Sequence, residues 1–143
     1  MASNINVKFA AVTTPFSMKN FKKYYIISAN PEEIYNALTI PLSLQIWTGE
    51  PAEMSTEAGS EFSLWDGAIV GKNIEFITNK KIVQQWYFDG QPEESIVTIK
   101  LHDDKKGTSV EVNHTNIPDA EYDGFADGWD SSYFGPLTDF FGF

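Results

Sequence analysis

Two histidines are the residues in this chain of 143 whose type and position best suit acid–base chemistry. His114 follows Val110 and Val112 at intervals of two, so its ring is predicted to point to the buried face of a strand. An inward histidine could orient a ligand or act as a base near neutral pH, whereas a hydrogen-bonded core histidine would do neither. His102 falls on the opposite, solvated face. We therefore expect the two histidines to share no metal site.

A dense run of carboxylates at residues 119–130 is the second candidate. Acids fall at positions one, three, five, nine and twelve of a calcium-binding loop, and a glycine falls at position six. Residues 108–115 before the run have the pattern of a strand, whereas an EF-hand needs a helix there. The same acids would line the outer face of an amphipathic helix. We expect that helix, and no metal or other cofactor.

Composition excludes several other kinds of chemistry. The chain has no Cys, so disulfides, thiolate metal sites and cysteine nucleophiles are ruled out. Ten lysines, no arginine and twenty acids give a net charge of −10, which disfavours nucleic-acid binding.

No nucleophile elbow, P-loop or dinucleotide fingerprint is present, and we expect no enzyme. No apolar run approaches a membrane span and no signal peptide begins the chain, so we expect a cytoplasmic protein without membrane contact.

Aromatic side chains are abundant, with eleven Phe, six Tyr and four Trp. Such residues either line apolar pockets or simply fill a core. Gly124 and Gly128 lie among them on a predicted helix, where each costs about 1 kcal/mol relative to Ala. They would either draw that helix toward its neighbours or leave room beside it. The candidate lining of a ligand cavity is Trp65, Trp86, His114, Phe125, Trp129 and Tyr133.

The elements that would position these residues begin with a loose arm at residues 1–20 and a strand at 21–28. Asn30, Pro31 and Glu33 form a helix-capping signature, and Pro41 ends that helix and begins a short second one. From 52 to 115 the apolar period is two, which predicts an antiparallel meander with one wet face. Asp66-Gly67 predicts a tight hairpin, and Gly71 a bulge. The predicted strands are 62–65, 69–78, 82–88, 95–103 and 108–115.

Residues 119–141 return to a helical period, with Tyr122, Phe125 and Trp129 on one face. Pro136 is expected to kink or restart this helix. The pattern predicts an α+β domain in which a long C-terminal helix lies across a curved antiparallel sheet.

Several short motifs occur in the order typical of one known family. The first of these motifs are residues 30–39, Trp47-Thr48-Gly49 and Asp66-Gly67. The last are Gly128-Trp129, residues 133–137 and residues 141–143. Over residues 21–143 the chain resembles the family named for the C-terminal domain of the activator of Hsp90 ATPase. One departure is Tyr87, which follows Trp86 where the family often has Arg.

The resemblance implies a START-like, or Bet v 1-like, helix-grip fold at residues 21–143. It also implies a non-catalytic binding domain, with a role in chaperone binding and the stress response. The partner would be an Hsp90-type chaperone or a small hydrophobic ligand. The alternative is a polyketide cyclase or dehydratase-like enzyme that uses the same cavity, with His114 or a tyrosine as acid or base. No arginine is available to capture phosphate, and the co-chaperone's separate N-terminal domain is not part of the resemblance, so we expect little stimulation of a chaperone ATPase by this chain alone.

Overall fold

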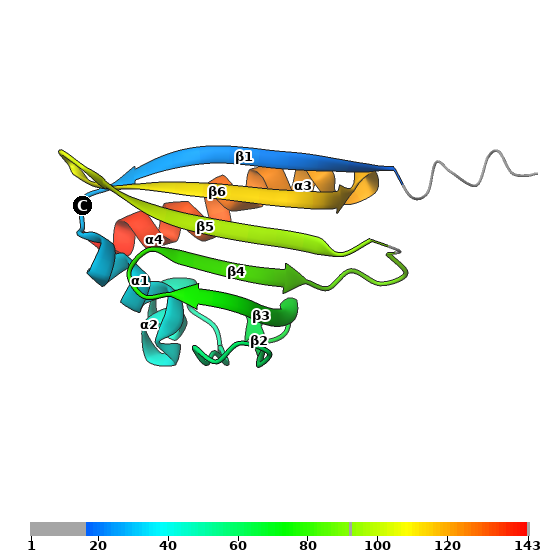
Figure 1. Ribbon diagram of the computed structural model, residues 1–143, viewed down its shortest axis with the longest axis horizontal. Coiled ribbons are helices and arrows are strands. Elements are labelled where there is room, and N and C mark those ends of the chain that lie inside the picture. Colours follow the sequence, from blue (N-terminus) through cyan, green and yellow to red (C-terminus); the bar gives the residue numbers. More distant parts are fainter. Residues whose placement is uncertain (1–16, 92, 143) are drawn as a thin grey trace, which may run out of the picture.

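A curved six-stranded antiparallel sheet and a C-terminal helical rod form the two layers of the computed structural model, which describes residues 17–91 and 93–142 (Figure 1). The strand order is β1-β6-β5-β4-β3-β2. The strands are β1 (Met18–Ile27), β2 (Glu61–Leu64), β3 (Ile69–Ile77), β4 (Lys81–Trp86), β5 (Ser95–Asp104) and β6 (Gly107–Pro118). The helices are α1 (Pro31–Thr39), α2 (Pro41–Thr48), α3 (Asp119–Gly128), the π-helix η2 (Trp129–Phe134) and α4 (Gly135–Phe140). The predicted α+β helix-grip architecture is confirmed.

Helix α1 begins at the predicted residue and for the predicted reason. The side chain of Asn30 accepts a hydrogen bond from the Glu33 backbone N–H at 2.9 Å, and the Glu33 carboxylate accepts one from the Asn30 N–H at 3.1 Å. This reciprocal pair satisfies two backbone donors that a helix start leaves open. The helix ends at Thr39, Pro41 opens α2, and Gly49 closes α2 in the left-handed region at a φ of 79°.

Strand β1 begins earlier than the sequence indicated. Met18 and Lys19 pair with Pro118 and Ile117 of β6, so residues 18–20 are not part of a loose arm. The reason is that β6 continues to Pro118, past the predicted end at residue 115, and pairs with β1 there. Residues 1–16 of the expected arm lie outside the described residues.

Gly71 lies in regular register opposite Trp86, and the bulge predicted there is wrong. The irregularity in the β3–β4 pairing falls instead between Asn73 and Glu75. Gly71 is needed for another reason. A Cβ at this position would lie 2.0 Å from the Gln85 carbonyl oxygen and 2.8 Å from the Phe62 ring. The three strands therefore meet too closely here for any side chain.

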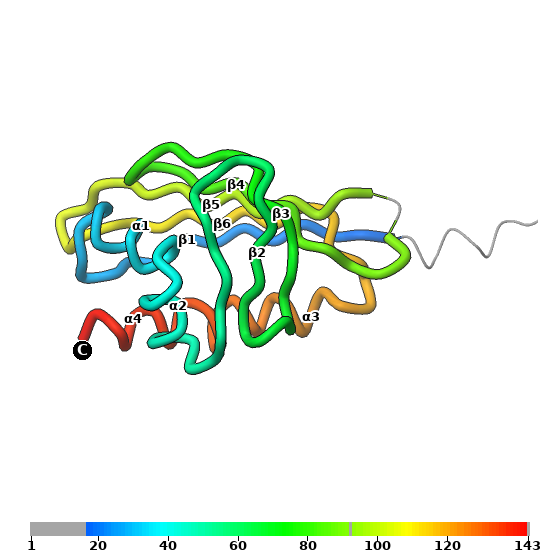
Figure 2. The backbone as a smooth tube through the Cα atoms, turned by 90° about the horizontal axis from the view of Figure 1, so that it is seen from below, coloured from blue at the N-terminus to red at the C-terminus, as the bar shows by residue number. Residues whose placement is uncertain are grey.

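The helical layer runs along one face of the sheet, as Figure 2 shows from below. Phe134 stacks on Tyr25 of β1 with ring centroids 4.0 Å apart. The Asp130 carboxylate accepts hydrogen bonds from the Tyr25 hydroxyl at 2.6 Å and from the Lys23 ammonium at 2.9 Å. These contacts fix the middle of the rod against the edge strand. The opposite face of the sheet is wet, and there His102 pairs with Glu111 at 3.0 Å, as the alternation predicted.

The rod contains a π-helical segment that the sequence analysis did not predict. In a regular α-helix five residues advance by about 500°, so Phe134 would lie about 140° around the axis from Trp129. The wider π turn brings residues five apart onto one face, and Trp129, Tyr133 and Phe134 are all buried. Pro136 has no N–H to continue the α pattern, and α4 restarts beside it. The predicted restart at Pro136 is thus confirmed.

Candidate functional site

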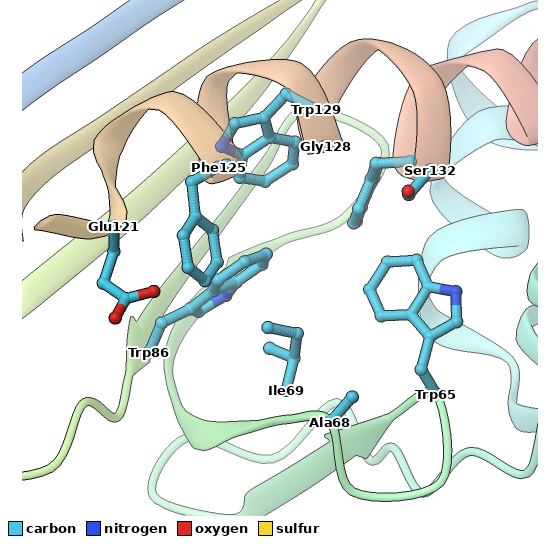
Figure 3. A pocket seen from close by; sticks show the side chains of 11 residues that line it. Trp65, Ala68, Ile69, Trp86, Glu121, Phe125, Gly128, Trp129 and Ser132 are labelled. Atoms are coloured by element: carbon cyan, nitrogen blue, oxygen red, sulfur yellow. The ribbon is translucent and has the colours of Figure 1, made fainter.

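A pocket of about 440 Å³ opens between the helical rod and the β2–β3 hairpin (Figure 3). Its walls come from the hairpin, from the end of β4, and from α3 and η2. The lining residues are Trp65, Ala68, Ile69, Trp86, Glu121, Gly124, Phe125, Gly128, Trp129, Ser132 and Tyr133. Five of the six residues proposed from the sequence are among them. The sixth, His114, lies behind the pocket wall.

Gly124 and Gly128 form the part of the helical wall without side chains. A Cβ placed on either glycine would meet no atom within 4 Å. Neither glycine therefore serves to draw the helix against the sheet. The sequence left two outcomes open, and the structure agrees with the second: both glycines leave room beside the helix. The space that they leave is part of the pocket.

The opposite wall is held by an unusual backbone at Trp65. Its φ is +52°, a region that bulky residues rarely adopt and that costs about 1–3 kcal/mol. Asp66 and Gly67 follow at positive φ and complete the tight turn that the sequence predicted. The strained Trp65 ring is edge-on to Trp47 at 6.3 Å and to Tyr133 at 6.0 Å. The strain thus places an aromatic ring at the side of the pocket.

The inner end of the pocket is a stack of aromatic rings. Trp86 of β4 and Trp129 of η2 lie 5.0 Å apart and 26° from parallel. Phe125 stands edge-on to Trp86 at 6.1 Å, and Figure 3 shows it above that ring on the helix side. These side chains are flat and rigid. The surface that they offer suits an apolar partner.

His114 is fully buried and fixed by two hydrogen bonds. Its Nδ1 accepts from the Trp129 indole N–H at 3.1 Å, and its Nε2 lies 2.9 Å from the Ser95 hydroxyl oxygen. That hydroxyl is also 2.9 Å from the Thr115 carbonyl, which can only accept. The proton positions follow. Ser95 donates to Thr115, so Nε2 must carry the hydrogen that it donates to Ser95, and the ring is neutral.

This bonding leaves His114 without a nitrogen that could meet a ligand. Both ring nitrogens are occupied, and the ring lies behind Trp86 and Trp129 rather than at the pocket. Burial lowers the pKa of His114 to about 3, so the ring stays uncharged at neutral pH. The inward orientation predicted from strand alternation is confirmed. Of the two roles left open, the structure favours the hydrogen-bonded core residue.

A second buried polar chain was not foreseen from the sequence. The Trp86 indole N–H donates to the Gln84 side-chain oxygen at 3.1 Å, and the Gln84 amide donates to Asn73 at 3.0 Å. Asn73 in turn donates to the Ser55 carbonyl and the Ser60 hydroxyl, both at 3.1 Å. Strand alternation could have revealed this chain, since Gln84 lies in phase with Trp86 and is therefore inward. It holds the Trp86 ring in one orientation.

The acidic segment at residues 119–130 forms helix α3 and the start of η2, which confirms the predicted helix. Within residues 17–91 and 93–142, no group of three or more metal-binding side chains is found. Across the same described residues no helix is both long and apolar enough to span a membrane.

Residues 28–142 match the family described as Activator of Hsp90 ATPase homolog 1-like protein. The activator of 90 kDa heat shock protein ATPase homolog 1 of Homo sapiens is 29% identical over 143 residues, which cover 99% of this chain and 42% of the human protein. The activator homolog of Dictyostelium discoideum is 32% identical over 114 residues, 78% of this chain and 30% of that protein. The chain spans less than half the length of these curated relatives.

Solved structures share the fold. An HSP90 activator from Plasmodium falciparum superposes with a TM-score of 0.75 at 26% identity, covering 85% of this chain and 94% of that one. A protein of the dynemicin biosynthetic locus superposes with a TM-score of 0.70 at 18% identity, covering 83% of this chain and 45% of that one. The similarity to the protein of the dynemicin biosynthetic locus shows a shared fold and nothing more.

Proposed function

Since this chain belongs to the family of activator of Hsp90 ATPase homolog 1-like proteins, we propose that it is a non-catalytic binding domain whose pocket takes a small apolar molecule. The observation that carries this proposal is the open pocket of about 440 Å³ between the rod and the hairpin. That volume lies within the range of about 300–1,000 Å³ common for small-molecule sites.

The pocket is also space that the protein could have filled. Protein interiors normally pack with few voids larger than water. With twenty-one aromatic residues the chain has ample bulk, yet Gly124 and Gly128 are each left with no atom near their missing Cβ. Each glycine in a helix interior costs about 1 kcal/mol relative to Ala. Retaining two of them at the pocket wall is consistent with a space kept for a ligand.

The enzyme alternative lacks support from His114, one of the two acid–base candidates that the sequence offered. A general base must reach the proton that it abstracts. The nitrogens of His114 are both engaged by protein partners behind the pocket wall. The likeness to the protein of the dynemicin locus is one of fold and does not extend to activity. Binding without chemistry is therefore the function that we propose.

Filling the pocket should weaken binding without harming the fold. We expect Gly128→Leu to reduce the affinity for naphthalene at least tenfold, because the new side chain enters the open space. Stability should hold or rise, since Leu favours a helix over Gly by nearly 1 kcal/mol. Isothermal titration calorimetry measures the affinity.

Ala120→Leu is the matched control, because Ala120 lies exposed in the same helix and does not line the pocket. It should bind naphthalene as the unaltered chain does. If naphthalene does not bind the unaltered chain, or binds Gly128→Leu equally well, the pocket is not an apolar binding site.

A second candidate function is docking on an Hsp90-type chaperone. The relatives in the human and Dictyostelium proteomes carry the name of activators of such a chaperone's ATPase. Helix α2 offers a surface for a protein partner, since Leu42 and Ile46 are 67% and 60% exposed. The two residues are four apart and so lie on one helical face. Apolar side chains exposed side by side are typical of protein contacts.

We expect the double change Leu42→Ser and Ile46→Ser to weaken binding to an Hsp90-type chaperone of the same organism at least tenfold, measured by surface plasmon resonance. Both side chains project from the surface, so folding should be unaffected. Tyr24→Ser is the control, since Tyr24 is 54% exposed on the far face of the sheet. Equal affinity of all three proteins would rule out α2 as the docking surface.

A further inference from the structure

Tyr133 carries a polar group, its phenol hydroxyl, in a buried position. The residue is 5% exposed and lines the pocket. Among residues 17–91 and 93–142, no hydrogen-bond partner is found for its hydroxyl. Other buried donors nearby do have partners: the indole N–H groups of Trp47, Trp86 and Trp129 each donate to a protein acceptor at 2.9–3.1 Å.

Such a group is costly if it stays unpaired. Most buried polar side-chain atoms in proteins have a partner, and leaving one without costs about 1–3 kcal/mol. Burial raises the pKa of Tyr133, so the phenol keeps its proton and remains a donor at physiological pH. The pocket is the open space that Tyr133 borders. A ligand held in that space is the candidate for the missing acceptor.

The shape and charge of the pocket restrict those contents further. Figure 3 shows the Trp86 and Phe125 rings on one side of the open space and the Trp65 ring on the other. Flat rings on both sides favour a flat occupant that can stack. Glu121 places a carboxylate at the pocket's edge, as Figure 3 shows, and no lysine of the described part of the chain lines the pocket. An anionic group would meet repulsion there.

We propose that the pocket selects neutral, planar aromatic molecules that carry a hydrogen-bond acceptor for the Tyr133 hydroxyl. This inference rests on the proposed binding function and adds to it the class of ligand. The aromatic walls bind the ring system, the Tyr133 hydroxyl binds one carbonyl, ether or hydroxyl oxygen, and Glu121 disfavours carboxylates.

Three naphthalene probes of similar size test the proposal. 2-Acetylnaphthalene carries a carbonyl acceptor, 2-ethylnaphthalene lacks it, and 2-naphthoate replaces it by an anion. Calorimetric affinities are measured for the unaltered chain and for Tyr133→Phe, which removes only the hydroxyl. We expect Tyr133→Phe to weaken 2-acetylnaphthalene about fivefold, as one net hydrogen bond would, and to leave 2-ethylnaphthalene unchanged. 2-Naphthoate should bind more weakly than 2-acetylnaphthalene.

The stability of the empty protein supplies an independent readout. If the hydroxyl has no protein partner, Tyr133→Phe should raise or leave unchanged the melting temperature; a clear fall would reveal a partner and overturn the inference. Loss of 2-acetylnaphthalene and 2-ethylnaphthalene affinity in equal proportion would also overturn it, while the apolar pocket stands. Failure of 2-ethylnaphthalene and 2-acetylnaphthalene to bind the unaltered chain would overturn the proposed binding function as well. Tighter binding of 2-naphthoate than of 2-acetylnaphthalene would overturn the expected preference for neutral molecules.

Discussion

Gly71→Ala should lower the free energy of unfolding by about 3 kcal/mol or more, the largest effect that we expect from a single methyl group in this chain. The added Cβ would lie 2.0 Å from the Gln85 carbonyl oxygen, which is a backbone atom of the neighbouring strand. Relief requires β3 and β4 to separate, and that breaks the ladder carrying Trp86. Differential scanning calorimetry should show the melting temperature falling by about 10 °C or more.

Gly128→Ala is the matched control, because it makes the same chemical change at a position where the new Cβ meets no atom within 4 Å. Ala is favoured over Gly in a helix by about 1 kcal/mol, so this variant should be slightly more stable than the unaltered chain. If Gly71→Ala and Gly128→Ala melt at the same temperature, the close approach at Gly71 does not constrain the sheet.

Acid should destabilise this protein through His114, beginning just below neutral pH. Its pKa is lowered from 6.5 to about 3 by burial, so between these values the unfolded chain binds a proton that the folded chain does not. The stability that the neutral His114 ring contributes is therefore fully present above about pH 6.5 and falls as the pH drops. The loss is about 1.4 kcal/mol per pH unit, or about 2 kcal/mol at pH 5.

Urea denaturation at pH 7 and pH 5 measures this loss, with His114→Gln as the comparison. The variant is expected to be less stable at both pH values, because it disrupts the bonds to Trp129 and Ser95. Between pH 7 and pH 5, the free energy of unfolding of the variant should nevertheless fall by about 2 kcal/mol less than that of the unaltered chain. Every other titratable group is the same in the two proteins. An identical change in the two proteins would show that His114 is not kept neutral by the fold.

The sequence was most informative where a local rule decides the structure. The capping box of Asn30 and Glu33 and the positive-φ turn at Asp66-Gly67 depend on neighbouring residues alone, and both were predicted. Strand alternation likewise placed His114 inward, because a period of two assigns every side chain to a face. It did not show what His114 would meet. Trp129 and Ser95 approach it from other elements.

Features that depend on how elements meet in space were missed or misjudged. Gly71 was assigned to a bulge, since the closeness of Gln85 and Phe62 is a property of three paired strands. The two readings of Gly124 and Gly128 could be separated only after the distance from helix to sheet was known. The π-helix was also missed, although one local signal pointed to an irregularity there. The Gly135-Pro136 pair marked a disturbance of the α pattern, but nothing in it specified a wider turn.

The stacked pair of Trp86 and Trp129 has a consequence for light absorption. Two indoles 5.0 Å apart and 26° from parallel are close enough for their transition dipoles to couple, so we expect their ultraviolet bands to differ from those of isolated rings. Trp65 lines the same pocket, and Trp47 stands edge-on to Trp65 and Tyr133. These four are all the tryptophans in the chain. Its near-ultraviolet spectrum is therefore dominated by chromophores at or beside one cavity, and the molecule carries an intrinsic optical probe of that cavity's occupancy without any added label.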